Sequence, residues 1–566
     1  MKSSAESWPL SPWWRFLLIT GVVLLYLAVG VFDHSIWSPM EPAVAGAVWN
    51  MHEHGDLAVP RINGFLYLEK PPLYYWMALA TCKLYGTLDS GLMRLPAAVL
   101  GLVSLLLIYR IGRKRYGEAV GAIVFLLGAT TFSMYWFSHY ACSDVAALFF
   151  CFLCFTIFVD SLTGTNGRSR PVHDVALSLA LSASFYAKNF YTFIIVLPPI
   201  VLFLLYRRDW RRILTLTAAT AIFLPLLLLP WCISLYRSGG WECLRIVFFD
   251  NTLGRFLNLP YLNDITVNLL NDAFIAERGH SLPDFLAGLP ASAAPWLLLV
   301  AVAIVALYRR SFPASDVRLF LKIGIISIPV LLSFSSTRVS TYLTPMIFFF
   351  LMTMGEFLHD VFAGKRPLAK WEHVLLTVNT GLVAWLLAAG LVVLSVWSGG
   401  WTLLATIPCV LLLAVAIWRS RRLWSERTFV LPFLLAVTVA TMGVLIPMIP
   451  RVEEEKAYRF FFESVSREAH RRSLYTTYCD DRRLPLIVFY LDREVAVVKS
   501  APEVFALLES GRPVAVIVPP SFCDTWRDRL AQTPHQAIST ERGKKSFVLL
   551  AAGKLDRPAA CNGDKP

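Results

Sequence analysis

Residues 56–76, DLAVPRINGFLYLEKPPLYYW, decide how this chain is interpreted. Within them Glu69 and Lys70 stand side by side and are followed by two prolines and an aromatic run. The stretch comes after the first long hydrophobic segment, and ionisable groups near a membrane are costly and tend to be functional. We therefore interpret the pair as functional. The alternative is a salt bridge that only fixes a loop.

The composition on either side of this stretch is that of a polytopic membrane protein. Of the 566 residues, 56% are hydrophobic and 16% are charged, against about 25% charged residues in soluble domains. Hydrophobic runs of about 17–25 residues cross a hydrocarbon layer of ~30 Å as helices. We predict thirteen such spans, near residues 14–32, 91–109, 117–137, 143–162, 174–188, 190–206, 213–235, 291–308, 318–336, 340–361, 371–397, 401–418 and 428–449.

The basic residues gather in clusters that set the predicted orientation. If the N-terminus is cytoplasmic, the inside loops hold Lys and Arg, as the positive-inside rule requires. These clusters lie within residues 110–115, 168–170, 207–212, 309–310, 365–370 and 419–427. The short outside turns hold none, with the exception of Arg338. The net charge of +13 is therefore explained by the basic residues of the inside loops. For this reason we predict no nucleic acid partner.

Three regions outside the spans share the predicted outer face, residues 33–90, 236–290 and 451–566. The first two are outer loops of a transmembrane catalytic domain that covers residues 1–450. The third is a domain of its own, because an odd number of spans places the end of the chain outside. A site built from the two loops opens to that outer face.

Two short helices are expected to lie along the membrane interface within the first loop. Residues 38–54 read as an amphipathic helix, in which Ser38 caps the N-terminus and Glu41 completes a capping box. Gly55 is its expected C-cap. Residues 72–86 are apolar and aromatic but too short to cross the membrane, so we predict a second interfacial helix there.

Residues 451–566 alternate short apolar runs with helix-like pieces, which predicts a small soluble α/β domain. The predicted strands are residues 486–490, 495–498, 514–518 and 546–549, and the predicted helices are residues 454–470, 502–510 and 521–530. The region has no nucleotide fingerprint and no nucleophile motif, so no chemistry is assigned to it. Cys479 and Cys523 form a disulfide only if this face of the membrane is oxidising.

Asp144 and Lys188 are further ionisable residues near the predicted outer face. Asp144 begins the fourth predicted span, and Lys188 ends the fifth. A carboxylate suits a general base or a metal, and a cation suits a phosphate. The alternatives are a helix cap for Asp144 and a cation that snorkels to the interface for Lys188.

His280, Arg338 and Tyr342 complete the candidate set. His280 lies in the second outer loop, where a lone histidine is usually solvated. Arg338 and Tyr342 share the outside turn that breaks the positive-inside pattern. The positive-inside rule does not explain a cation on this face, so we expect Arg338 to bind an anion. Cations, carboxylates and a histidine on one face of a membrane bundle predict a site for a lipid-linked phosphate.

Residues 55–76 resemble the motif of the GT-C glycosyltransferases of the dolichyl-phosphate-mannose protein mannosyltransferase and aminoarabinose transferase type (glycosyltransferase family 83). That pattern is Gly-Asp-Trp, then Pro-x-x-Asn-Gly, then Glu-Lys-Pro-Pro-Leu-x-Tyr-Trp, and more than ten positions match. The likeness covers roughly residues 10–350, and the last third of the chain matches only in layout.

Other positions extend the resemblance. Asp144 stands where the family has an Asp at the approach to the fourth span. Lys188 resembles the Lys of a Lys-Gly step, with Asn189 in place of the Gly. The turn from Arg338 resembles Ser-x-x-Lys-x-x-x-Tyr-x-x-Pro, with Arg in place of Lys, and His280 resembles the loop His that precedes a Pro-Trp pair.

One departure concerns the acid that is usually taken as catalytic. The family has an acidic pair in a motif like Pro-Asp-Glu after the first span, and this chain has Pro39, Met40 and Glu41. Met40 therefore replaces the first acid. Either Glu41 takes over its role, or Glu41 is only the capping residue of the interfacial helix.

The resemblance implies an inverting transfer from a polyprenyl-phosphate sugar to lipid A or another envelope glycan or protein. The residues that it implies for binding the lipid phosphate are Lys70, Lys188, Arg338 and Tyr342. Asp144 or Glu41 is implied to orient or deprotonate the acceptor. Glu69 and His280 are implied to share a divalent metal ion, and no nucleotide is required.

Three functions are weighed on these residues. The first is the transferase, in a bacterial inner membrane with a cytoplasmic N-terminus and a periplasmic C-terminal domain. The second is a transporter of lipid or sugar, which is expected to carry charges at the bilayer midplane and inverted repeats that are not visible here. The third is a non-catalytic protein that binds a lipid-linked sugar, with Met40 as the lesion.

Overall fold

The structure of the chain is a computed structural model that describes residues 20–21, 23–163, 170–257, 281–309, 315–398, 424–540 and 542–553. The chain divides into two compact units. The helical unit comprises Met1–Asp33, Leu68–Val267 and Glu277–Ile449, and the α/β unit comprises His34–Tyr67, Asn268–Ala276 and Pro450–Pro566.

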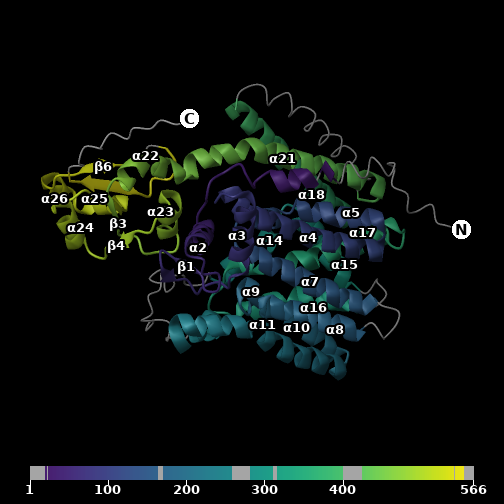
Figure 1. The fold of residues 1–566 in the computed structure, drawn as a ribbon. Coiled ribbons are helices and arrows are strands. Elements are labelled where there is room, and N and C mark those ends of the chain that lie inside the picture. Colours follow the sequence, from purple (N-terminus) through teal and green to yellow (C-terminus); the bar gives the residue numbers. More distant parts are fainter. Residues whose placement is uncertain are drawn as a thin grey trace. The chain divides into compact units, whose positions relative to one another are not determined.

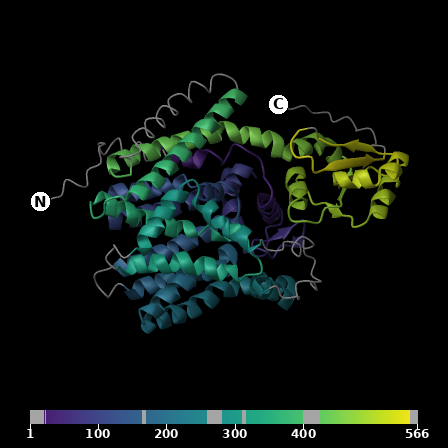
Figure 2. The same cartoon turned by 180° about the vertical axis from the view of Figure 1, so that it is seen from behind.

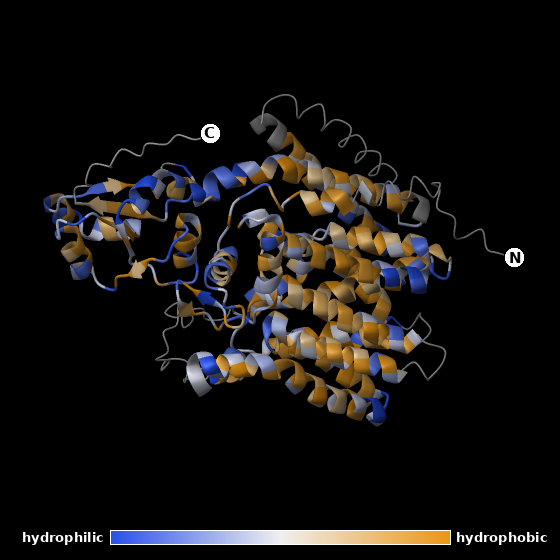
Figure 3. Ribbon diagram, in the orientation of Figure 1, coloured by the Kyte–Doolittle hydropathy of each residue, from blue (hydrophilic) through white to orange (hydrophobic). Residues whose placement is uncertain are grey.

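Apolar helices that pack side by side build the helical unit (Figure 1). Their bounds are α3 Leu73–Tyr85, α4 Ser90–Tyr116, α5 Glu118–Ala129, α6 Phe132–Ser138, α7 Ser143–Thr163, α8 Arg170–Ala183, α9 Phe185–Lys188, α10 Tyr191–Tyr206, α11 Trp210–Arg245, η2 Ile246–Gly254, α12 Arg255–Leu257, α13 Leu282–Leu286, α14 Gly288–Ala293, α15 Leu297–Tyr308, α16 Asp316–Ser333, η4 Ser340–Leu343, α17 Met346–Phe362, α18 Lys370–Ser398 and α21 Arg427–Lys456. α7 contacts α4 and α10, and α10 also contacts α16. Hydrophobic residues predominate along these helices (Figure 3).

The described residues contain six helices that are long and apolar enough to cross a membrane, or up to eight if each of two bent pairs is one span. Helices lie in each predicted span that falls wholly within those residues. The count is lower because α5 and α6 bend by 70°, and because α10 is short for a span. Parts of segment 14–32 and all of segment 401–418 lie outside the described residues, so the number thirteen stays a prediction.

A cluster of aromatic rings fixes the packing in the middle of the helical unit. Phe155 of α7, Phe320 of α16 and Phe349 of α17 pack with ring centroids 4.8–6.1 Å apart. Gly324 of α16 makes this possible, because a Cβ atom there would lie 1.9 Å from the Phe349 ring. Such close packing gives the neighbouring polar side chains a rigid support.

The α/β unit contains a five-stranded sheet with the strand order β4-β3-β5-β7-β6, seen in yellow in Figures 1 and 2. Its elements are α2 Glu41–His54, β1 Arg61–Ile62, β2 Phe65–Leu66, α22 Arg459–His470, β3 Ser473–Thr476, α23 Leu484–Leu491, β4 Ala496–Val497, α24 Ala501–Leu508, β5 Val514–Val518, α25 Pro520–Thr525, α26 Arg527–Gln532, β6 Gln536–Ile538 and β7 Val548–Ala552. β3 is parallel to β4 and β5, whereas β7 is antiparallel to β5 and β6. Apolar residues of β5, β7 and α24 form the core beside the sheet.

One predicted strand of this unit is wrong. Residues 486–490 lie inside helix α23, which begins with a proline in its first turn and ends at Asp492 in the left-handed conformation. A short, fully buried apolar run fits a strand or a buried helix equally well, so periodicity alone did not separate them. Cys479 and Cys523 do not form a disulfide in the structure.

Helix α2 also differs from the expected interfacial helix. It begins at Glu41, with Pro42 in its first turn, and the N-cap is Met40, whose side chain makes no capping hydrogen bond. Ser38 therefore caps nothing, and the Glu41 carboxylate accepts a hydrogen bond from the backbone N–H of Trp37 over 2.8 Å. Residues 41–51 are all buried, so α2 has no polar exposed face along that part. Gly55 is the C-cap, as predicted.

Candidate functional site

A cavity in the helical unit brings together several residues that the sequence singled out. Its volume is about 640 Å³, counted out to its open mouth, which is the size of a small-molecule site. We call it the polar cavity, and it is lined by Glu69, Lys70, Lys188, Asn189, Phe190, Tyr191, Ile194, Asn251, Thr252, Phe256, Leu332, Ser335, Thr337 and Tyr342. Residues from segments more than 250 positions apart therefore share one wall.

Glu69 and Lys70 form an ion pair at the edge of the polar cavity, just before α3. Lys70 Nζ donates to Glu69 Oε1 over 2.8 Å, and the two side chains are 19% and 17% exposed. Asn251 of η2 donates its side-chain N–H to the carbonyl oxygen of Leu68 over 2.8 Å, which fixes the backbone next to the pair. An ammonium group has three donor hydrogens, and the contact with Glu69 uses one of them.

Asp144 and Lys188 form a second, more deeply buried pair. Lys188 Nζ donates to Asp144 Oδ1 over 2.6 Å, and the side chains are only 8% and 10% exposed. The ammonium group also lies over the rings of Tyr191 and Tyr342, at 4.5 and 4.6 Å from their centroids. A carboxylate and two aromatic faces thus compensate the burial of this cation.

The turn that contains η4 places Tyr342, but not Arg338, at the cavity wall. The backbone oxygen of Tyr342 accepts a hydrogen bond from the Tyr191 hydroxyl over 3.0 Å. Arg338 Nη1 lies 3.5 Å from the carbonyl oxygen of Ser333, and Thr337 lines the cavity in its place. The predicted contact of Arg338 with a lipid phosphate therefore stays a prediction.

Asn189 is a cavity residue whose backbone conformation is unusual. Its φ of 47° and ψ of −142° fall near a region that is essentially restricted to glycine, where another residue costs about 1–3 kcal/mol. The sequence carried one signal of this, because Asn189 occupies the position of the Gly in the related motif. Asn251 and Thr252 of η2 also line the cavity, and no sequence signal pointed to them.

The structure does not place Glu41 or His280 relative to the polar cavity. Glu41 belongs to the α/β unit, where its side chain is buried and receives the N–H of Trp37. His280 lies outside the described residues. Among the residues that are described, no three His, Cys, Asp or Glu side chains gather as metal ligands, and Glu69 is paired with Lys70. These side chains alone do not fit a metal ion, so no step is derived through one.

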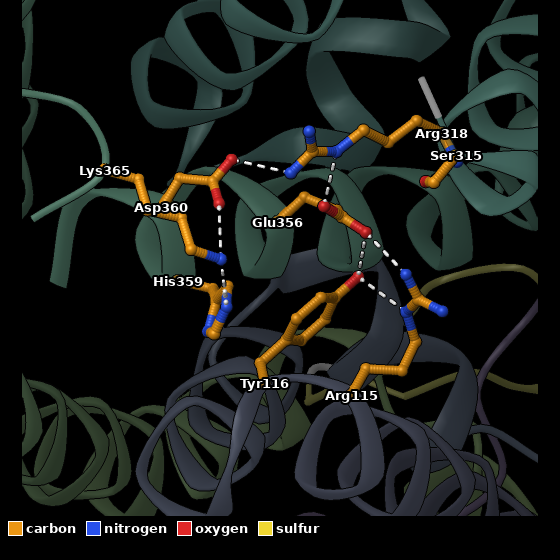
Figure 4. Close-up of polar contacts among 8 residues, drawn as sticks. All are labelled: Arg115, Tyr116, Ser315, Arg318, Glu356, His359, Asp360 and Lys365. Carbon is orange, nitrogen blue, oxygen red and sulfur yellow. Dashed lines mark hydrogen bonds and ion pairs between the residues drawn. The ribbon is translucent and has the colours of Figure 1, made fainter. Parts of the chain in front are cut away.

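A separate ionic cluster in the helical unit joins α4, α16 and α17 (Figure 4). Glu356 Oε1 lies 2.9 Å from Arg115 and Oε2 lies 2.7 Å from Arg318, while Asp360 accepts from Arg318 over 2.7 Å. The cluster sits near the end of α4 and the end of α17, whereas Tyr342 precedes the start of α17. It is therefore at the opposite end of these helices from the polar cavity.

Two cations and two tyrosines around one partly open cavity suit a phosphate that is attached to an apolar chain. The cations supply charge-assisted hydrogen bonds, which are about twice as strong as neutral ones. Each cation already has a carboxylate partner, so an incoming phosphate shares an ammonium group and does not meet an uncompensated charge. Hydrophobic residues predominate along the helices of this unit in the view of Figure 3, which suits an apolar lipid chain.

Comparison with known proteins agrees with this geometry. Residues 69–233 match the family model of dolichyl-phosphate-mannose-protein mannosyltransferases. The chain is 25% identical over 373 residues to an undecaprenyl phosphate-alpha-4-amino-4-deoxy-L-arabinose arabinosyl transferase of Pseudomonas aeruginosa, which covers 65% of this chain and 64% of that protein. A transferase of the same name from Edwardsiella ictaluri is 24% identical over 71% of this chain and 72% of its own length. The chain thus spans less than two thirds of the Pseudomonas relative that it matches.

The same likeness extends to solved structures. ArnT from Cupriavidus metallidurans, bound to undecaprenyl phosphate, superposes with a TM-score of 0.73 at 18% identity, over 97% of this chain and 100% of that one. Its apo form gives a TM-score of 0.70. The apolar helices and the bacterial relatives indicate a multi-pass protein of the bacterial inner membrane. The chain is thus similar in sequence to the aminoarabinose transferases and similar in fold to ArnT, and its motifs resemble those of the GT-C glycosyltransferases.

Proposed function

We propose that this protein transfers a sugar from a polyprenyl-phosphate donor to an acceptor at the outer face of the membrane. The observation that carries the proposal is the pair of lysines, Lys70 and Lys188, that line one cavity in a bundle of apolar helices. The relatives named above are undecaprenyl phosphate-alpha-4-amino-4-deoxy-L-arabinose arabinosyl transferases, and the motif that contains Lys70 resembles the pattern of that family. The acceptor class is lipid A or another envelope glycan or protein.

The reaction that suits these groups is a single displacement. An acceptor oxygen attacks the anomeric carbon, the bond from that carbon to the phosphate oxygen breaks, and its electron pair stays on the polyprenyl phosphate. Lys70 and Lys188 stabilise the charge that develops on the leaving phosphate. The acceptor proton passes to a carboxylate, for which Asp144 and Glu41 are the two candidates.

Asp144 is the candidate that lies beside the cavity cations. One of its oxygens is bound to Lys188, and the residue also lines a small hollow with Tyr191, Thr341 and Pro345. Met40 in place of the family acid favours a second candidate function, a protein that binds the lipid-linked sugar without transferring it.

The proposed orientation places the cavity on the periplasmic side. Asp160, in the last turn of α7, pairs with Arg110 and Lys114 of α4. Asp144, in the first turn of α7, is 16 residues away, which is about 24 Å along a helix. The basic residues that the positive-inside rule assigns to the cytoplasm thus lie at the other end of α7 from the cavity. A cytoplasmic N-terminus and a periplasmic α/β unit belong to the same proposal.

Transfer of label from donor to acceptor tests the function. Purified protein in lipid vesicles is mixed with radiolabelled undecaprenyl-phosphate sugars and an extract of bacterial envelope, and wild type is compared with Asp144→Asn. Label that enters an acceptor only with wild type supports the transferase, and the mobility of the product gives the acceptor class. Saturable binding of the donor without any transfer would favour the non-catalytic function.

A further inference from the structure

Two side-chain oxygens in the wall of the polar cavity have no hydrogen-bond partner among the described residues. They are Oδ1 of Asn189 and Oγ1 of Thr252, and both atoms are inaccessible to solvent in the structure. Buried polar atoms are paired in the great majority of native proteins, so each exception asks for a reason. Both residues line the same cavity as Lys70 and Lys188.

The conformation of Asn189 gives a second and independent observation. The residue is 7% exposed, and its backbone lies in a region that glycine prefers. A glycine at this position avoids the strain and leaves no orphaned oxygen. Strained backbone conformations cluster at ligand sites, so an asparagine that keeps this strain at a cavity wall points to a function of its side chain.

The orientation of the amide decides which of its two polar atoms is left without a partner among the described residues. Asn189 Nδ2 points to the backbone oxygen of Glu69 at 3.5 Å. In the flipped orientation two acceptor oxygens would face each other there, so the amide is held with its oxygen free. The free atom is therefore an acceptor only, and the hydroxyl of Thr252 accepts or donates.

An acceptor of this kind needs a ligand group that donates a hydrogen bond. The oxygens of an ionised phosphate diester accept hydrogen bonds, and a polyprenyl chain has no polar atom. The hydroxyl and amino groups of a sugar donate. Asn189 follows Lys188 in sequence, and both residues line the same cavity.

We infer that Asn189 and Thr252 bind a hydroxyl or amino group of the donor sugar, next to the lipid phosphate, and select the sugar that is transferred. The assignment rests on the proposed function and adds a specificity role for residues outside the motif-derived set. Lys70 and Lys188 bind the lipid phosphate, which all such donors share, whereas Asn189 and Thr252 bind the sugar, which differs between donors.

Binding of matched lipids tests this division of roles. The probes are undecaprenyl phosphate without sugar and a panel of undecaprenyl-phosphate pentoses and hexoses that includes 4-amino-4-deoxy-L-arabinose. They are titrated into the purified full chain, as wild type, Asn189→Gly and Thr252→Val. Gly is the residue that the backbone at 189 prefers, and Val keeps the shape of Thr, so both variants retain the fold. Thr252→Ser, which keeps the hydroxyl, is the rescue variant.

In wild type, at least one sugar-bearing lipid is expected to bind more tightly than the sugar-free lipid. Each variant is expected to lose roughly fivefold to tenfold of that advantage, as expected for one hydrogen bond, while sugar-free lipid binds within about twofold of wild type. Thr252→Ser is expected to keep the affinity advantage of the sugar-bearing lipid.

Three results overturn the inference in different ways. If no sugar-bearing lipid binds wild type more tightly than the sugar-free lipid, the cavity does not bind the sugar. If Asn189→Gly weakens both lipids equally, Asn189 serves the phosphate or the fold. If undecaprenyl phosphate itself does not bind to wild type, the proposed function fails, and the sugar assignment fails with it.

Discussion

Removal of one partner from the buried pair of Asp144 and Lys188 is expected to destabilise the helical unit strongly. The atoms Nζ and Oδ1 are 2.6 Å apart, and the side chains are 8% and 10% exposed. At an effective dielectric constant of about 20, the Coulomb attraction is about 6 kcal/mol, from which the desolvation of both ions must be subtracted. Because the remaining ion is left buried without its partner, we expect Asp144→Asn and Lys188→Met each to lower the free energy of unfolding by about 3–5 kcal/mol.

A double-mutant cycle measures whether this loss belongs to the pair. Asp144→Leu combined with Lys188→Met leaves no buried charge and is expected to recover most of the stability, but not the binding of a lipid phosphate. Unfolding of each variant is followed by circular dichroism in mixed micelles with increasing SDS.

The matched control is Asp174→Asn, which breaks the buried pair of Asp174 with Arg212 and leaves the polar cavity intact. It is expected to destabilise the unit by a similar amount and to keep the affinity for lipid phosphate. Single variants at Asp144 and Lys188 that unfold within about 1 kcal/mol of wild type, or a double variant whose loss is the sum of the two, would refute the electrostatic reasoning.

Four further outcomes are expected from the same geometry. Lys70→Ala abolishes transfer while the protein stays folded and inserted, and retained turnover in the vesicle assay would exclude its role at the phosphate. Glu41→Gln lowers turnover far more than Met40→Ala if Glu41 is the base, and equal, mild effects of the two would make Glu41 a structural residue only. Glu356→Gln leaves two partly buried arginines short of a carboxylate and lowers stability by about 3 kcal/mol, but titration shows unchanged affinity for undecaprenyl phosphate. Asn189→Gly relieves backbone strain and raises the midpoint of SDS unfolding, by about 1–3 kcal/mol in free energy, and a lower midpoint would contradict the strained conformation.

Much of the helical unit is predictable from the sequence because membrane spans are long and apolar, and basic clusters separate them. The same pattern does not show where a span bends, so the break between α5 and α6 was read as one helix. The short buried run at residues 486–490 was read as a strand, since hydrophobicity is equal on all sides of it. Local capping was also misjudged at Glu41, where Pro42 moved the start of α2.

Within the candidate site, charged residues were predictable and neutral ones were not. Glu69, Lys70, Asp144 and Lys188 stand out in an apolar chain because buried charges are rare. Their pairing across long sequence separations depends on the fold, as the contact between Asp144 and Lys188 shows. Asn and Thr side chains occur in every loop, so Thr252 became visible only when its oxygen was found buried and unpaired.

Binding of undecaprenyl phosphate to the purified protein tests the central claim most directly. Native mass spectrometry of wild type, Lys70→Ala, Lys188→Met and Glu356→Gln separates the lipid-bound from the free protein in each sample. We predict saturable binding of one lipid to wild type and Glu356→Gln, and strongly reduced binding to the two lysine variants. Equal binding to all four proteins, or no binding to wild type, would contradict the claim that this cavity holds a lipid-linked phosphate.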